Sequence, residues 1–73
     1  MKYRQPKTPT EKEMVTLLKE KFSDDPDFLT GIMTFLETED ERQSMIDEIE
    51  AGHVSTREHV VMFAVQMDEE REE

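Results

Sequence analysis

The chain contains no cysteine and no tryptophan, and it has only two glycines and three prolines among 73 residues. Without cysteine it forms neither a disulfide nor a thiolate metal site. Two isolated glycines make no glycine-rich loop of the kind that binds phosphate groups. Small domains often need disulfides, metals or oligomerisation because they bury a limited fraction of their surface. Helix packing or self-association therefore has to stabilise this one.

Long apolar runs are also missing. The longest, residues 60–65, has six residues, far fewer than the roughly 18 of a membrane span. Residues 1–12 contain no apolar run of the kind found in a secretory signal. We therefore expect a soluble, cytoplasmic protein that does not bind membranes.

Basic residues are scarce outside the N-terminal segment. Residues 1–21 carry six Lys/Arg and three Asp/Glu, a net charge of +3, whereas residues 22–73 carry three and sixteen, a net charge of −13. Direct nucleic-acid binding usually requires a basic stripe, which this pattern lacks. The total of −10 gives solubility and attracts a basic partner surface.

Signals for helix starts occur four times. A Ser or Thr followed three residues later by Glu has the spacing of a capping box, in which the two residues satisfy each other's backbone N–H groups. An Asp before Pro is a cap followed by proline at the first helical position. The four signals are Thr10 with Glu13, Asp25 with Pro26, Thr38 with Glu41, and Ser55 with Glu58.

These signals, with Gly52 as a C-terminal cap, predict an all-α fold: a compact bundle of four short helices. We place the helices at about 11–22, 26–37, 39–51 and 56–68. They form a single domain over 10–68. Pro6 and Pro9 disfavour helix before it, so 1–9 is predicted to be a flexible basic arm, and the acidic residues 69–73 to fray.

Apolar spacing identifies a core-facing side on each helix. The second helix carries the least charge, and we expect it to be central. The expected core residues are Met14, Val15, Leu17, Leu18, Phe22, Phe28, Leu29, Ile32, Met33, Phe35, Leu36, Met45, Ile46, Ile49, Val60, Phe63, Ala64 and Met67.

The fourth helix is apolar over more than one face. Val61 and Val65 widen its core-facing side, and Met62 lies nearly opposite at 100° per residue. Its β-branched valines also suit a strand, but no second strand-like run is present to pair with it. Methionines mostly fill gaps in cores, and Met62 is the exception that we expect to contact a partner.

No constellation of residues indicates catalysis, a cofactor or a metal. His53 and His59 are six residues apart and do not have metal-ligand spacing. The acidic segment 24–27 contains a proline and does not match a calcium loop. We therefore predict a protein that is not an enzyme and has no cofactor and no small-molecule substrate.

A helix–turn–helix was also considered, because Gly52 lies in a short turn between the last two helices. The last helix would be the recognition helix. Arg57 at its start is the one residue there that could contact nucleic acid, and its neighbours are acidic. Direct DNA binding is therefore not the expected function.

The leading prediction is a non-enzymatic protein–protein interaction module that acts as a small accessory or regulatory protein. Its expected partner is another protein, and a second copy of the chain in a homodimer is one candidate. The expected partner-binding residues lie on the last helix and are Val61, Met62, Val65 and His59.

The alternative is an acidic decoy that imitates a nucleic acid and inhibits a basic nucleic-acid-binding protein. Its surface comprises Glu39, Asp40, Glu41, Asp47, Glu48 and Glu50. A decoy binds through many charge pairs and weakens steeply with salt, whereas an apolar helix interface does not.

Overall fold

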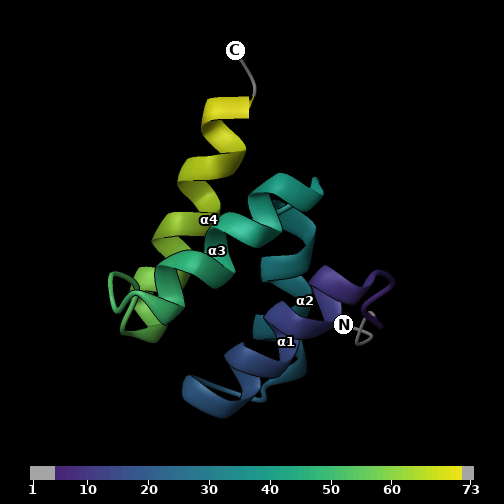
Figure 1. The fold of residues 1–73 in the computed structure, drawn as a ribbon, viewed down its shortest axis with the longest axis vertical. Coiled ribbons are helices and arrows are strands. Elements are labelled where there is room, and N and C mark those ends of the chain that lie inside the picture. Colours follow the sequence, from purple (N-terminus) through teal and green to yellow (C-terminus); the bar gives the residue numbers. More distant parts are fainter. Residues whose placement is uncertain (1–4, 72–73) are drawn as a thin grey trace.

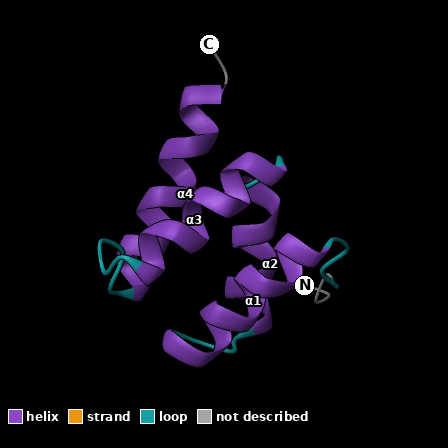
Figure 2. Cartoon of the chain, in the orientation of Figure 1, coloured by secondary structure: helices purple, strands orange, loops and turns teal. Residues whose placement is uncertain are grey.

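The computed structural model describes residues 5–71, which form four α-helices and no strand (Figures 1 and 2). The all-helical fold predicted from the sequence is confirmed. The helices are α1 (Pro9–Lys21), α2 (Pro26–Phe35), α3 (Glu39–Glu50) and α4 (Arg57–Arg71). The arm and tail predicted over 1–9 and 69–73 lie partly outside the described residues.

The first helix begins earlier than the sequence analysis places it. Thr8, not Thr10, is the N-cap, and its Oγ1 accepts a hydrogen bond from the backbone N–H of Glu11. Pro9 is the first helical residue, where its missing N–H and fixed φ are favourable. The assignment of Pro9 to the arm was therefore wrong, because this proline starts the helix.

The last helix also differs at both ends. Thr56 accepts from the backbone N–H of His59 through its Oγ1 at 3.0 Å, so Thr56 has the capping contact predicted for Ser55. The helix then continues to Arg71 instead of ending near residue 68.

The other predicted caps are confirmed. Asp25 accepts from Asp27 N–H ahead of α2, and Thr38 and Glu41 form a complete capping box at α3. After α3, Gly52 has φ of 83°, a left-handed conformation that glycine adopts without steric cost. The N–H groups of Gly52 and His53 donate to Ile49 and Glu48 carbonyls, which is the Schellman arrangement.

The helices pack in a ring. α1 lies against α3, α3 against α4, α4 against α2, and α2 against α1. α2 is therefore not surrounded by the other three helices as predicted, and its Thr34 side is exposed. Figure 1 shows that the last turns of α4 extend beyond the other helices.

One hydrophobic core joins all four helices. Every buried apolar residue belongs to the core predicted from the sequence except Val54, which precedes α4 and is 2% exposed. The buried apolar residues are Met14, Val15, Leu18, Phe28, Leu29, Ile32, Met33, Leu36, Met45, Ile46, Ile49, Val54, Val60 and Ala64.

A buried ion pair, absent from the sequence predictions, connects α1 to α3. Arg42 Nε lies 3.4 Å from Glu11 Oε2, and these residues are 9% and 1% exposed. Glu11 Oε1 also accepts from the backbone N–H of Lys7 at 2.9 Å. These contacts fix the start of α1 against α3.

The same arginine closes the corner between α2 and α3. Its Nε and Nη2 each donate at 3.1 Å, to the carbonyls of Leu36 and Glu37, while Nη1 donates to Glu39 Oε2 at 2.6 Å. α2 has no basic residue in its last turn, so Arg42 supplies the cation that stabilises carbonyls at a helix C-terminus.

We expect Arg42→Ala to lower the free energy of unfolding by about 3–5 kcal/mol, because it removes the cation that balances the buried Glu11 carboxylate and the donor to two carbonyls. Arg57→Ala is the matched control. Arg57 also has an ion pair, 3.7 Å from Asp25, but its side chain is 52% exposed, so we expect a loss of at most about 1 kcal/mol. Urea unfolding of both variants tests this, and equal losses would contradict the assigned role of burial.

Candidate interaction surface

The outer face of α4 exposes apolar side chains. Met62 is 67% exposed and Val61 is 39% exposed, and these are the two large hydrophobic residues on the surface of the described chain. Val65, one turn after Val61, is half-buried. Val60 and Ala64, on the core-facing side, are fully buried, so the helix is apolar towards the core and also towards solvent.

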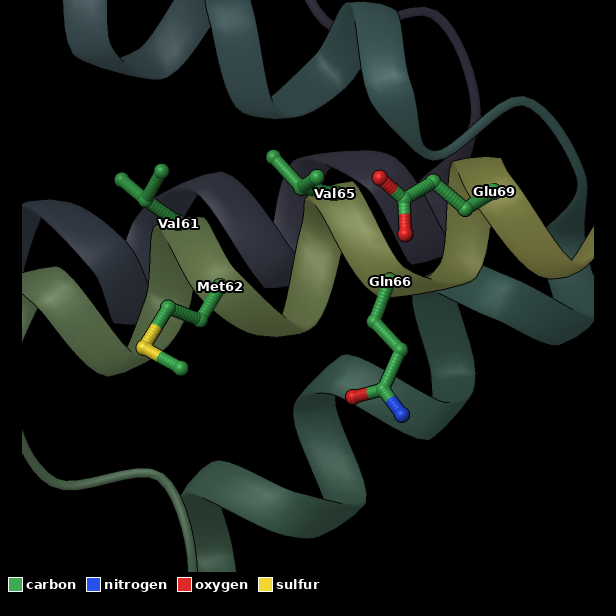
Figure 3. A pocket seen from close by; sticks show the side chains of 5 residues that line it. All are labelled: Val61, Met62, Val65, Gln66 and Glu69. Carbon is green, nitrogen blue, oxygen red and sulfur yellow. The ribbon is translucent and has the colours of Figure 1, made fainter.

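These outward side chains lie in two rows. Figure 3 shows Val61, Val65 and Glu69 projecting from one side of α4, and Met62 and Gln66 from the other. A shallow hollow of about 440 Å³ is lined by these five residues. Rows spaced by four residues are the ridges between which a partner helix packs.

A second hollow, which we call the α2–α4 groove, joins the first at Val61. Its volume is about 310 Å³. Phe28, Ile32 and Phe35 of α2 and Val61 of α4 provide its apolar lining, and α2 also contributes Gly31. The predicted residues Val61, Met62 and Val65 therefore belong to a wider surface that includes α2.

Charged groups flank the groove. Asp25, Asp27 and Arg57 complete its lining. The guanidinium of Arg57 is already engaged, because it lies 3.7 Å from Asp25 Oδ2 and 5.0 Å from the centre of the Phe28 ring. This placement also leaves Arg57 less suited to the DNA contact considered for a recognition helix.

Gly31 was not identified from the sequence as a candidate site residue. It lies inside α2, and a Cβ added there would meet nothing within 4 Å. A helix is less stable with glycine in its interior than with alanine. Gly31 therefore makes α2 less stable, although no steric crowding requires a glycine there. The sequence does contain a signal for this residue, a lone glycine within a helical pattern. It contains no signal that α4 packs beside that glycine.

The two histidines are not brought together as a site. His59 is exposed but does not line either hollow, and His53 Nδ1 lies 3.1 Å from Glu48 Oε1 on the surface. Among the described residues, no group of three or more His, Asp or Glu side chains is placed to hold a metal ion.

The acidic residues proposed for a decoy surface all belong to α3, but several have intramolecular partners. Glu39 accepts from Arg42 and Thr8, and Glu41 completes the capping box. Asp40, Asp47 and Glu50 are exposed. Asp47 also accepts from Gln43 Nε2 at 3.0 Å and Glu39 is itself exposed, so internal contacts and exposure overlap among the six carboxylates.

The pKa of the Glu39 carboxyl group departs clearly from its ordinary value. The hydrogen bond from Arg42 holds the pKa of Glu39 below 4.5, and the hydrogen bond from Thr8 acts in the same direction. Both donors favour the charged carboxylate.

Comparisons with known proteins gave no match: no family model, no curated protein and no solved structure matches this chain. No helix within residues 5–71 has both the length and the apolar character needed to cross a membrane.

Because the folded-state pKa of Glu39 is lowered, its contribution to stability is present above its unfolded pKa and is lost as the pH falls through the folded value. We expect Glu39→Gln to destabilise the protein at pH 7, with the difference disappearing in acid. Urea unfolding from pH 7 down to pH 3 measures this. Asp40→Asn, which removes the neighbouring charge, is the control. A Glu39→Gln deficit that persisted unchanged in acid would contradict the assignment.

The two glycines should respond in opposite directions to alanine. At Gly31 the space is open and the backbone is helical, so Gly31→Ala should raise the free energy of unfolding by about 0.5–1 kcal/mol. At Gly52, φ of 83° disfavours a side chain, so Gly52→Ala should be destabilising. Thermal unfolding compares them, and a destabilised Gly31→Ala protein would show that the groove floor is closed to a methyl group.

Proposed function

We propose that this protein is a non-enzymatic interaction module that binds another protein through the outer face of α4. The observation that carries the proposal is the exposure of Val61 and Met62, which line one hollow on the outside of α4, whereas Val60 and Ala64 of the same helix are buried in the core. A contiguous exposed apolar area on a small domain typically marks an interface.

The outer face of α4 has apolar area whose burial against a partner would provide binding free energy. Burying one Val or Met side chain completely is worth about 1.5–3 kcal/mol. Met62, at 67% exposed, has the most area to lose. Helical ridges with a hollow between them also suit a partner helix better than a flat surface does.

The non-enzymatic part of the proposal rests on where titratable groups lie. The acidic groups near the hollows, Asp25, Asp27 and Glu69, line shallow surface features formed by α2 and α4. General acid–base chemistry uses carboxylates in a cleft with altered pKa values. Glu39, whose pKa is lowered by its hydrogen bonds, lines neither hollow.

The acidic decoy is the second candidate, favoured by the net charge of −10 and by the exposed carboxylates of Asp40, Asp47 and Glu50. It ranks lower because four of the six carboxylates, Glu39, Glu41, Asp47 and Glu48, have partners within the chain. Binding by a decoy depends on many charge pairs and is therefore strongly salt-dependent.

The test is a tagged pull-down from lysate of the source organism, washed in parallel at low and high salt. We expect Met62→Asp to remove a partner that survives high salt, because it places a charge in the apolar face. A surface change at so exposed a position should alter stability by less than about 0.5 kcal/mol. Thr16→Asp, on the exposed face of α1, is the matched control.

A salt-resistant partner retained equally by Met62→Asp and Thr16→Asp would contradict the proposal. A basic nucleic-acid-binding protein that washes off with salt, and that Met62→Asp still captures, would make the acidic decoy the better function.

A further inference from the structure

We infer that the partner is a basic amphipathic helix, which lies along α4 and inserts an apolar side chain into the α2–α4 groove over Gly31. The inference rests on the proposed function and deepens it, because it names the chemistry of the partner and extends the binding surface to α2. Three features of the groove carry it: the open space at Gly31, the helical walls and the charge of the rim.

The open space at Gly31 is the first feature. A Cβ at this position would touch nothing, yet Gly31 lines the groove beside Ile32 and Phe35. Without a side chain at this position, the groove between α2 and α4 remains available to an incoming group. Alanine would fit at this position and would stabilise the helix. The glycine is therefore better explained by the room that it leaves for a partner side chain than by the folding of α2.

The second feature is the form of the walls. Within α2 and α4 the backbone N–H and C=O groups pair inside each helix, so they offer no free edge to which an extended strand could add. Side-chain ridges and the hollows between them are what a helix recognises. From Val61 to Glu69 the outer face of α4 is about 12 Å long, or roughly two turns, at 1.5 Å per residue. An incoming helix with apolar residues at i, i+3, i+4 and i+7 matches that length.

The third feature is the charge of the rim. Asp27 and Asp25 line the α2 side, and Glu69 projects from α4 on the same side as Val61 and Val65 (Figure 3). The one cation lining these hollows, Arg57, is paired with Asp25. The rim therefore has a net negative charge, and Lys or Arg residues that flank apolar anchors complement it.

The same charges disfavour a second copy of this chain as the occupant. The apolar stripe of α4 is preceded by the exposed Glu58 and followed by the exposed Glu69. An antiparallel pairing of two copies brings Glu58 of one towards Glu69 of the other, and a parallel pairing sets each against itself. Juxtaposed like charges are costly at an interface, and each copy also has a net charge of −10.

The experiment uses a synthetic probe: a helical peptide of about 16 residues with leucines at the i, i+3, i+4 and i+7 positions and lysines beside them. In the control peptide, every lysine is replaced with glutamate. Binding is measured by fluorescence anisotropy, and the contact surface by methyl NMR. We expect the lysine peptide to shift the methyl signals of Ile32, Val61 and Val65, and to leave those of Met14 and Met45 in the core unchanged.

Two variants test the groove and the rim separately. Gly31→Leu fills the groove and should weaken the lysine peptide at least tenfold. Asp27→Asn/Glu69→Gln should weaken it and reduce its salt dependence. Glu13→Gln/Glu20→Gln, on the exposed side of α1, removes the same net charge far from the groove and should retain binding. Circular dichroism and thermal unfolding establish that each variant is folded, and the rim variant tests the inference if Gly31→Leu does not fold.

The inference is overturned if the glutamate peptide binds as well as the lysine peptide, if the lysine peptide shifts signals of α3 instead, or if neither Gly31→Leu nor the rim variant weakens it. Dimers at micromolar concentration that Gly31→Leu dissociates would identify a second copy as the occupant and also overturn it. The proposed function fails separately: a cellular partner lost with Met62→Asp but kept by the groove and rim variants would leave the α4 interface standing.

Discussion

The arrangement of the helices depends on the buried guanidinium of Arg42. A single cation contacts the carboxylate of Glu11 from α1, two carbonyls at the end of α2 and the carboxylate of Glu39 in α3. Burying a charge is costly unless its partners replace water, and here the partners come from three helical segments. A chain with so many acids and so few cations in its second half uses this arginine to hold the corner where the segments meet.

The two pairs of helices in the ring, α1 with α3 and α2 with α4, differ in their contacts and in the surface that they present. α1 and α3 meet through the ion pair as well as through apolar contacts, and their outer sides are charged. α2 and α4 meet mainly through apolar side chains, with the exposed Arg57–Asp25 pair beside the α2–α4 groove that remains between them on the outside. The polar network therefore fixes one pair of helices, while the other pair presents the apolar surface proposed for binding.

The sequence predicted the helix number and the core well, because capping signals and apolar periodicity are local patterns. It misplaced the starts of the first and last helices, because Thr8 caps the first in place of Thr10, and Thr56 makes the capping contact of the last in place of Ser55. It singled out Val61, Met62 and Val65 by periodicity alone. It missed Arg42 and Gly31, because the importance of each depends on which helices become neighbours, and no local pattern contains that information.

The position of Arg42 along the chain has a consequence for the order in which the protein folds. Its contacts to Leu36, Glu37 and Glu39 span six residues or fewer, whereas Glu11 is 31 positions away. Short loops close with a smaller loss of entropy than long ones. The corner between α2 and α3 is thus able to form before α1 docks. Arg42, held there by Glu39 and the two carbonyls, then offers its cation to the Glu11 carboxylate, which favours the native position of α1 over other collapsed arrangements.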